Sequence, residues 1–454
     1  MSNVSRTAAS RVLAWLRSQH GVCSQQVEIG FEEHSGGVGL VAARAAAAGD
    51  VLLSVPAACW QPLSARAARS ALPAAVVERV DASVAALGAG GGSLADAALL
   101  AAALASRPPH LSSVLSYLDE LPQPDVPLLW PAALRTALCH GSSVGPAVES
   151  QLSVSGHLHD ALSEALAHAG ASPPADVRSF RWAQAVLLSR AHSGEGKPLA
   201  LVPGLDLLNH GGDRAGALVR CTADGGGGMG GAFELVAARA HAAGEPLLID
   251  YGLRASHRLV RLYGFLPPEN QRGATEGAAA EAARSGHSLA AGEQVLLSLL
   301  PSPSELAGAP AAVHDAVQHH RHTLRSCGIP GTTLRLDVDS GGSVALPAAL
   351  AAALPAADGE GARQGAGASP QRRETAQAAL HVLRAAVQTQ MGRQRAGLEA
   401  CDAVQRAAAA AATSSADDSA RRRAVLCEQL LRNESRVLAA AAAELDALAA
   451  RVAI

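Results

Sequence analysis

The sequence is poor in aromatic residues and in lysine, and each scarcity limits what the chain can be. Four tryptophans, three tyrosines and four phenylalanines stand among 454 residues, and Lys197 is the one lysine. Charged residues make up 17% of the chain and the formal net charge is −3. The sequence therefore lacks the basic surface expected of a protein that binds nucleic acid or an anionic membrane.

Long apolar runs and paired cysteines are also missing. The best apolar run, 94–105, is too short to cross a bilayer and contains Asp96, so no transmembrane helix is predicted. The seven cysteines are scattered without a C-x-x-C pair, which disfavours zinc clusters and redox dithiols. The segment 1–11 has no apolar signal-peptide core. We therefore expect a soluble intracellular protein of the cytoplasm or a plastid, with the nucleus as a third compartment.

Patterning divides the chain into a mixed region and a helical region. Hydrophobic residues are 49% of the chain, enough for a substantial core, and the length allows two or three domains. Apolar runs predict strands near 25–55 and 200–249, with helical patterns over about 63–190 between them. We predict an N-terminal helix within 1–24 and an α+β domain over 25–265 that carries this helical insert. An all-α domain is predicted for 271–454, with a low-complexity break at 356–373.

One segment of the sequence has a similar copy further along the chain. The run from Ala42 to Leu53 is echoed by the run from Ala237 to Ile249, and each has a Gly-acid turn before an apolar stretch. The echo predicts two similar hairpins, and two copies are too few for a solenoid. Because the β segments stand on both sides of the helical insert, they must meet in space to make one sheet system.

Two segments hold the densest groups of polar and aromatic residues. Asp206, Asn209 and His210 lie within five residues inside an apolar run, where buried groups must find hydrogen-bond partners. An Asx turn at a strand end explains the same pattern. Tyr251, Tyr263 and Phe265 fall within 15 residues, although ordinary core packing would also gather them.

Three further patterns have simpler readings. The glycines of 36–39 allow a ligand to approach the backbone, but a strand follows them where a dinucleotide-binding loop needs a helix. The G-x-S-x-G match at 141–145 follows a predicted helix and not the strand that a nucleophile elbow requires. Four histidines within 314–322 lack nearby acidic or cysteine ligands and are interpreted as a solvated face. No metal site is predicted.

The order of these segments resembles the SET-domain protein methyltransferases, and more closely the branch typified by the Rubisco large-subunit lysine methyltransferase. The resemblance covers nearly the whole chain. It implies a β-rich SET domain with a long helical insert and a knot-like crossing between the Asn-His and Tyr-Gly segments. An all-α substrate-binding domain of the Rubisco LSMT type would follow. The segments that carry the resemblance are 37–42, 180–190, 202–210, 244–252 and 263–265.

The resemblance also implies a role for each candidate residue. S-adenosylmethionine would lie against the backbone of Gly36, Gly37, Val38, Gly39 and Leu40. Arg190 would meet the cofactor carboxylate through a charge-assisted contact. Asp206 would border the cofactor, and Asn209 and His210 would hold its amino group and adenine.

The aromatic residues would form the reaction channel. Tyr251 matches the catalytic tyrosine at the point of methyl transfer, and Tyr263 and Phe265 would wall the cofactor and the lysine channel. The sequence departs from the family pattern at Ser35, where an acidic residue or arginine is common. It departs again at Ala191, where an aromatic residue often stands. Both departures concern details of the pocket.

The implied activity is transfer of methyl groups from S-adenosylmethionine to a lysine of a non-histone protein. That protein would be bound partly by the C-terminal helical domain, and the enzyme is expected to be a monomer. In-line methyl transfer needs mainly alignment and a neutral amine, and no metal. Histidine as the acceptor and a non-catalytic SET-like protein-binding module are the two alternatives. The sequence leaves the substrate protein and the number of methyl groups open.

Overall fold

The chain is seen here in a computed structural model. It describes residues 3–19, 25–32, 37–87, 92–107, 123–171, 176–194, 197–222, 231–252, 255–267, 294–298, 318, 333–338, 344–345, 370–411 and 415–452. Contacts divide the chain into two compact units. The first comprises Met1–Trp130, Val148–Leu253 and Arg261–Pro267, and the second comprises Pro131–Ala147, Arg254–Val260 and Pro268–Ile454.

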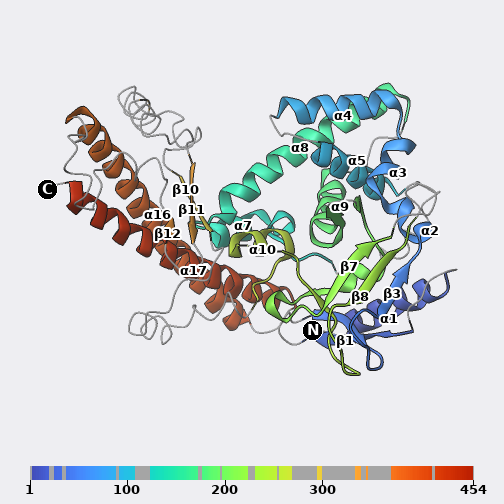
Figure 1. Ribbon diagram of the computed structural model, residues 1–454. Helices are drawn as coiled ribbons and strands as arrows, with labels where there is room; N and C mark the ends of the chain where they lie inside the picture. The colour runs from blue at the N-terminus through green and yellow to red at the C-terminus, as the bar shows by residue number, and fades with distance from the viewer. Residues whose placement is uncertain are drawn as a thin grey trace, which may run out of the picture. The chain divides into compact units, whose positions relative to one another are not determined.

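Small sheets form the β part of the first unit. Strands β3, β8 and β7 make a three-stranded antiparallel sheet, in which Val55 lies opposite Phe233 (Figure 1). Strands β1 and β2 form an antiparallel pair, β4 pairs with β5, and β6 pairs in parallel with β9. The strands are β1 (Val27–Glu32), β2 (Gly37–Ala42), β3 (Val51–Val55), β4 (His192–Gly194), β5 (Lys197–Ala200), β6 (Asn209–His210), β7 (Ala217–Cys221), β8 (Phe233–Ala237) and β9 (Leu248–Ile249).

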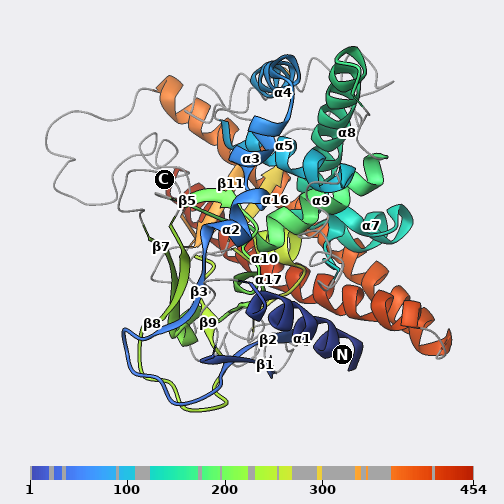
Figure 2. The ribbon, with the colours of Figure 1, turned by 90° about the vertical axis from the view of Figure 1, so that its right-hand side faces the viewer.

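The two echoed segments pair with each other. Figure 2 shows the loop after β2 and the loop after β8 running side by side. Ala46 and His241 exchange backbone hydrogen bonds at 2.9 Å in both directions. On one side of this bridge the Ala42 N–H donates to the Glu245 carbonyl, and on the other the Ala237 N–H donates to the Asp50 carbonyl, each at 2.9 Å. The repeat in the sequence is therefore a repeat in space, related by an approximate twofold axis through the Ala46–His241 bridge. The prediction of two hairpins is wrong, because β2 pairs with β1 and β3 with β8, and the echoed segments pair with each other.

The same chemistry closes each of the echoed turns. The Asp50 carboxylate accepts the Ala47 N–H at 2.8 Å, and the Glu245 carboxylate accepts the Ala242 N–H at 2.8 Å. An acidic side chain that accepts a backbone N–H within its own turn stabilises the turn locally. This explains why an acidic residue follows the glycine in both copies.

Helices fill the chain between β3 and β4. Their apolar faces pack on one core with the sheets, and its largest fully buried side chains include Trp60, Phe180 and Phe233. Trp60 meets Phe233 edge-to-face with ring centroids 5.0 Å apart, so two of the scarce aromatic residues join the helical part to β8. The helices of this unit are α1 (Asn3–Arg17), α2 (Ala57–Trp60), η1 (Gln61–Leu63), α3 (Ala65–Ala71), α4 (Ala74–Ala86), α5 (Gly92–Ser106), η3 (Pro127–Leu129), most of α8 (Val144–His168), α9 (Val177–Arg190), η4 (Leu205–Leu207), η5 (Gly212–Arg214) and the end of α10 (Ser256–Tyr263).

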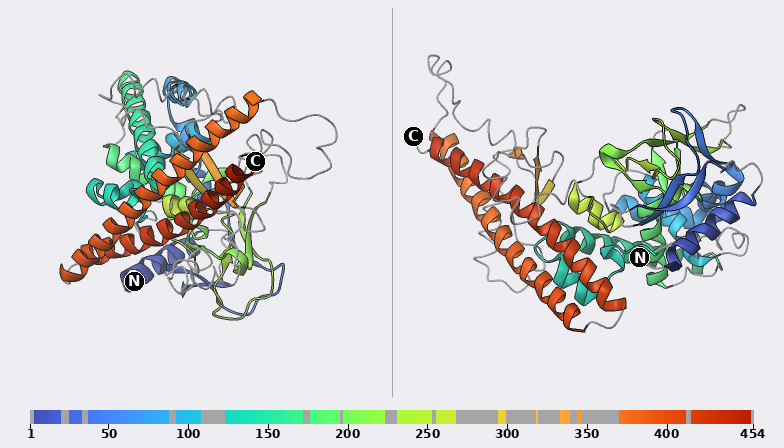
Figure 3. Two further views of the ribbon diagram at one scale, coloured as in Figure 1. Left: turned by 90° about the vertical axis from the view of Figure 1, so that its left-hand side faces the viewer. Right: turned by 90° about the horizontal axis from the view of Figure 1, so that it is seen from below.

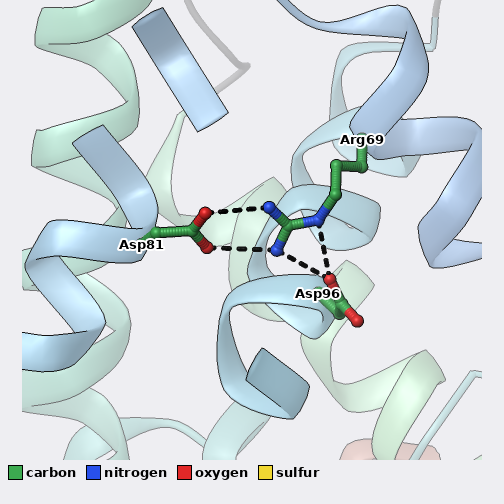
Figure 4. Close-up of polar contacts among 3 residues, drawn as sticks. All are labelled: Arg69, Asp81 and Asp96. Carbon is green, nitrogen blue, oxygen red and sulfur yellow. Dashed lines mark hydrogen bonds and ion pairs between the residues drawn. The ribbon is translucent and has the colours of Figure 1, made fainter. Parts of the chain in front are cut away.

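One arginine connects three helices of the insert. The Arg69 guanidinium of α3 forms two parallel hydrogen bonds to Asp81 of α4, at 2.9 and 3.0 Å (Figure 4). It also donates twice to one oxygen of Asp96 of α5, at 2.8 and 3.0 Å. These hydrogen bonds lower the pKa of Asp81. Forked contacts of this kind carry more geometric specificity than single ion pairs.

Two long helices dominate the second unit. Helices α16 (Pro370–Ala411) and α17 (Ser415–Val452) lie side by side in both views of Figure 3. Their core contains Leu383, Val387, Leu438 and Leu445. The unit also includes α7 (Ala132–Cys139), the beginnings of α8 and α10, and three antiparallel strands, β10 (Gln294–Ser298), β11 (Thr333–Val338) and β12 (Val344–Ala345).

The predicted α+β class is confirmed. The sheet β10–β12 was not predicted within the helical region, although Thr333–Val338 alternates polar and apolar residues as a half-buried strand does. Helix α16 begins at Pro370, inside the segment 356–373 that was predicted as a break, while 356–369 lie outside the described residues. The histidines of 314–322 also lie outside them. Within the described part of the chain, none of the helices combines the length and apolar character of a membrane span.

The Arg69 contacts predict a pH-dependent contribution to stability. Arg69→Met removes the hydrogen bonds to both Asp81 and Asp96. Because all three groups are partly exposed, we expect the free energy of unfolding to fall by only about 1 kcal/mol. This corresponds to a fall of roughly 2–4 °C in Tm. Because the folded pKa of Asp81 is lowered, the contribution is present above the unfolded value of about 3.9 and is lost as pH falls through the folded pKa.

Thermal melting followed by circular dichroism at pH 7 and at lower pH measures this difference. Arg79→Met is the matched control, because Arg79 makes a single contact to the exposed Glu164. We expect that control to change Tm by less than half as much. Equal effects of the two variants, or a difference that does not shrink in acid, would contradict the assignment.

Candidate functional site

The parallel pairing of β6 and β9 brings the Asn-His segment beside the Tyr-Gly segment. Asn209 lies opposite Leu248, and His210 lies opposite Ile249. Two contacts then fix Tyr251: its backbone N–H donates to His210 Nδ1 at 3.1 Å, and its hydroxyl donates to the Leu208 carbonyl at 2.5 Å. Since Nδ1 accepts this N–H, the proton of a neutral His210 ring lies on Nε2.

Strand β2 approaches the same place from the other half of the chain. A Cβ added to Gly39 would lie 2.5 Å from Asn209 Nδ2 and 3.4 Å from the Leu207 carbonyl oxygen. Only glycine therefore permits the backbone of β2 to pass so close to Asn209. The segments that the sequence analysis selected on both sides of the helical insert meet at this point.

Buried polar atoms gather next to this crossing. Asp206 is 7% exposed, and neither of its carboxylate oxygens accepts a hydrogen bond from the described residues. Asn209 Nδ2 is also buried and donates to none of them. Buried polar groups are nearly always satisfied in folded proteins, so groups without a protein partner point to a bound molecule or water.

Burial sets the ionisation of these groups. Loss of solvation raises the pKa of Asp206 well above its ordinary value, with a smaller opposing effect from the nearby backbone of Gly204 and Asp206. The Asp206 N–H itself is donated to the Val202 carbonyl at 3.2 Å. The carboxyl is therefore disposed to be neutral unless a cationic group lies beside it.

Arg190 at the end of α9 supplies a positive charge near this group. One of its terminal nitrogens donates to the Asp206 backbone carbonyl at 2.8 Å. Burial lowers the pKa of Arg190, and the neighbouring Tyr251 partly opposes that shift. Burial also raises the pKa of Tyr251, against a smaller lowering effect of Arg190. Tyr251 therefore stays a neutral hydroxyl throughout the physiological range.

Four aromatic rings, those of Tyr251, Tyr263, Phe265 and His210, lie in contact with one another. The Tyr251 ring lies 4.8 Å from that of Tyr263 and 5.2 Å from that of His210. Phe265 lies 6.2 Å from both Tyr263 and His210. These centroid separations are typical of aromatic pairs in contact. The rings form a small apolar group beside the buried polar atoms.

Gly264 makes the turn that places the last two rings. Helix α10 ends at Tyr263, and Gly264 follows with φ of +75°, a left-handed conformation that ends many helices. A Cβ at this residue would lie 2.2 Å from the Asp125 carbonyl oxygen. Sequence analysis missed the contribution of Asp125, because a backbone contact from a distant segment leaves no mark in the sequence.

The structure brings most of the selected residues to one place. Asn209, His210 and Tyr251 meet at the β6–β9 pair, with Gly39, Arg190, Asp206, Tyr263 and Phe265 around them. Gly37 and Val38 lie in β2 and are partly exposed. Leu40 belongs to the hydrophobic core and is 2% exposed, and its carbonyl accepts the Leu247 N–H at 2.8 Å, so its side chain does not face a ligand. Gly36 lies outside the described residues.

The described residues contain no group of three or more histidines, cysteines or acids that could hold a metal ion. Ser143, from the G-x-S-x-G match, is 1% exposed and follows α7. It therefore stands after a helix and away from solvent, which is the reverse of a nucleophile elbow.

The fold is similar to that of several solved structures. No protein-family model and no curated protein sequence matches the chain. The SET domain of LSMT bound to methyl-lysine and AdoHcy is 18% identical with a TM-score of 0.63, over 98% of this chain and 93% of that one. Rubisco LSMT bound to AdoMet is likewise 18% identical, with a TM-score of 0.62 over the same shares.

A third structure agrees. Rubisco LSMT bound to sinefungin and monomethyllysine is 20% identical with a TM-score of 0.61, over 100% of this chain and 93% of that one. The predicted resemblance is thus confirmed at the level of fold: the chain shares the fold of these SET-domain structures. The knot-like crossing, the domain boundaries and the roles of the individual residues stay predictions.

The turn after α10 predicts a large effect for one small substitution. Gly264→Ala introduces both a strained φ and a clash with the Asp125 carbonyl. We therefore expect it to lower the free energy of unfolding by more than about 2 kcal/mol. Gly244→Ala is the matched control, since Gly244 has φ of +79° but nothing within 4 Å of its added Cβ. Gly244→Ala therefore measures the cost of the positive φ alone, about 1 kcal/mol of the free energy of unfolding. Chemical denaturation of both variants gives the comparison, and equal losses would show that Asp125 does not restrict Gly264.

Proposed function

We propose that the protein is a methyltransferase that uses S-adenosylmethionine and methylates lysine side chains of a protein. The main support is a set of buried polar atoms to which the described residues make no hydrogen bond, the two carboxylate oxygens of Asp206 and Asn209 Nδ2, near the Tyr251 hydroxyl. In the structures of similar fold, AdoMet, AdoHcy or sinefungin is bound. A ligand with an amino group, a carboxylate and an adenine has groups that could pair with Asp206, Arg190 and Asn209.

The residues present fit such a cofactor. Gly39 leaves room beside Asn209, whose amide can pair with an amino group or a ring nitrogen. Arg190 offers a guanidinium to a carboxylate, and Asp206 offers acceptor atoms to a cationic amine. A cation next to Asp206 would restore its charged form against the effect of burial. Bound S-adenosylmethionine would supply a methyl group activated by its sulfonium.

Tyr251 has the features of a residue that aligns the reaction. Its hydroxyl proton is committed to the Leu208 carbonyl, so the lone pairs of its oxygen are left to face other groups. An oxygen held in this way stabilises polarised methyl hydrogens and an amine donor without moving during the reaction. The rings of Tyr263, Phe265 and His210 exclude water around it and favour the neutral, nucleophilic amine.

The finer features of the activity are also proposals. The substrate is a non-histone protein, bound partly by the second unit, and the enzyme acts as a monomer. The use of lysine is supported by the lysine and monomethyllysine held in structures of similar fold. Histidine as acceptor and a non-catalytic binding module are the alternatives, and cofactor titration with product analysis separates them.

The first test is cofactor binding. S-adenosylhomocysteine at 100 times its Kd stabilises by about 2.7 kcal/mol and should raise Tm by several degrees. Asn209→Ala removes a buried partner and should weaken binding by about tenfold or more. Gln405→Ala is the matched control, since that amide contacts Glu428 on the long helices. Absence of a Tm shift in the unmodified protein at millimolar ligand would refute the proposal.

The second test concerns turnover. Tyr251→Phe keeps the ring but removes the hydroxyl, and the rate should fall by about 10²–10³. Affinity for S-adenosylhomocysteine should change little. Tritium transfer from labelled S-adenosylmethionine to proteins of a cell extract, followed by mass spectrometry, measures the rate and identifies the acceptor. Tyr263→Phe should keep substantial turnover and alter the number of methyl groups added; full activity of Tyr251→Phe would make Tyr251 a packing residue only.

A further inference from the structure

The centre of the twofold repeat holds a buried histidine on one side only. His241 and Ala46 are equivalent residues of the two echoed segments, and they exchange backbone hydrogen bonds at 2.9 Å. Ala46 has no polar side chain, whereas His241 carries a ring and is 3% exposed. Because the backbone alone makes the pairing, the pairing does not explain why a polar ring is buried here.

The His241 ring contacts the backbone just before β7. Its Nε2 lies 2.8 Å from the carbonyl oxygen of Gly216. A carbonyl oxygen can only accept, so Nε2 carries a proton and donates it. The Gly216 carbonyl also accepts the Ala238 N–H at 2.8 Å, and both of its lone pairs are then used.

The other ring nitrogen faces a charged pair. His241 Nδ1 lies 3.4 Å from Glu245 Oε1, and the same oxygen pairs with a terminal nitrogen of Arg239 at 2.6 Å. Whether or not Nδ1 also carries a proton, the proton on Nε2 stays in place. The hydrogen bond to Gly216 therefore does not depend on the charge of the ring.

Gly216 connects this contact to β9. Its own N–H donates to the Leu248 carbonyl at 3.0 Å, and Leu248 lies opposite Asn209 in the parallel pair. A Cβ added to Gly216 would lie 2.8 Å from His241 Cε1, so the ring packs directly on this glycine. Because β9 is only two residues long, each hydrogen bond to it matters for its position. Tyr251 follows two residues after β9 ends.

We infer that His241 is a positioning residue for the site: by holding the Gly216 peptide it fixes β9 and thereby the place of Tyr251. All the residues of this series of contacts belong to the first unit. This role rests on the proposed function, in which Tyr251 aligns methyl transfer. Misplacement of a reacting group by about 1 Å can cost about a hundredfold in rate.

Two substitutions of similar length test the link. Gln and Met fill similar space, but only the Gln amide can donate to the Gly216 carbonyl. Protein labelled with 3-fluorotyrosine gives three ¹⁹F resonances, one for each tyrosine of the chain, and Tyr251→Phe identifies that of Tyr251. We expect His241→Met to shift this resonance and to speed amide exchange at Gly216 by about tenfold, as for one lost hydrogen bond. His241→Gln should restore most of both values.

A second histidine of the same unit gives the control. The His159 ring of α8 lies 5.8 Å from that of Phe180, and His159→Met should leave the Tyr251 resonance unchanged. Gly216→Ala, whose added methyl displaces the His241 ring, gives a second route if His241→Met does not fold. It should shift the Tyr251 resonance as well, and the double variant should shift it no further than His241→Met alone.

The outcomes separate this role from general damage and from the proposed function. Equal shifts in His241→Met and His241→Gln would overturn the inference, and so would an unshifted Tyr251 signal in folded His241→Met or Gly216→Ala. The spectrum needs no cofactor or substrate, so it decides the role of His241 even if S-adenosylhomocysteine fails to raise Tm.

Discussion

The structure depends on the backbone pairing of the two echoed segments. Hydrogen bonds on either side of the Ala46–His241 bridge join parts of the chain that are about 200 residues apart in sequence. Closing so long a loop is costly in entropy, and the cost is offset by the apolar strands that flank both turns. This pairing brings β2 to β6 and β9. Without it, Gly39 and Tyr251 would belong to separate halves of the molecule.

The site formed at that meeting point is costly in the absence of a ligand. The Asp206 carboxyl and Asn209 Nδ2 are buried without hydrogen bonds from the described residues, and such burial opposes folding unless water or a ligand supplies the missing partners. Neighbouring contacts, such as the Tyr251–Leu208 hydrogen bond, hold the geometry in place. Buried polar groups without hydrogen bonds are most often found at functional sites, where a bound molecule supplies the missing partners. The same atoms therefore define what the site can bind.

Several features could be predicted from the sequence because their signals are local. The order of the glycine, Asn-His and Tyr-Gly segments predicted the fold confirmed by the solved structures. The echo of 42–53 in 237–249 marked two similar turns, but the two hairpins predicted from it are not formed, because the strands beside each turn pair with other strands. The sheet of β10, β11 and β12 was not predicted, although the alternation of polar and apolar residues in β11 is a local strand signal. By contrast, the contact of the Asp125 carbonyl with Gly264 left no signal in the sequence.

The sequence by itself determined which residues are available: scarce aromatics near 251–265, a polar group at 206–210, and glycines where a side chain would not fit. These properties follow from composition and short-range spacing. Only the tertiary structure decided which of them meet, that Leu40 faces the core, and that Tyr251 is held by His210 and the Leu208 carbonyl. Backbone groups are the same in every residue, so a site that uses them is defined only when distant segments pack together.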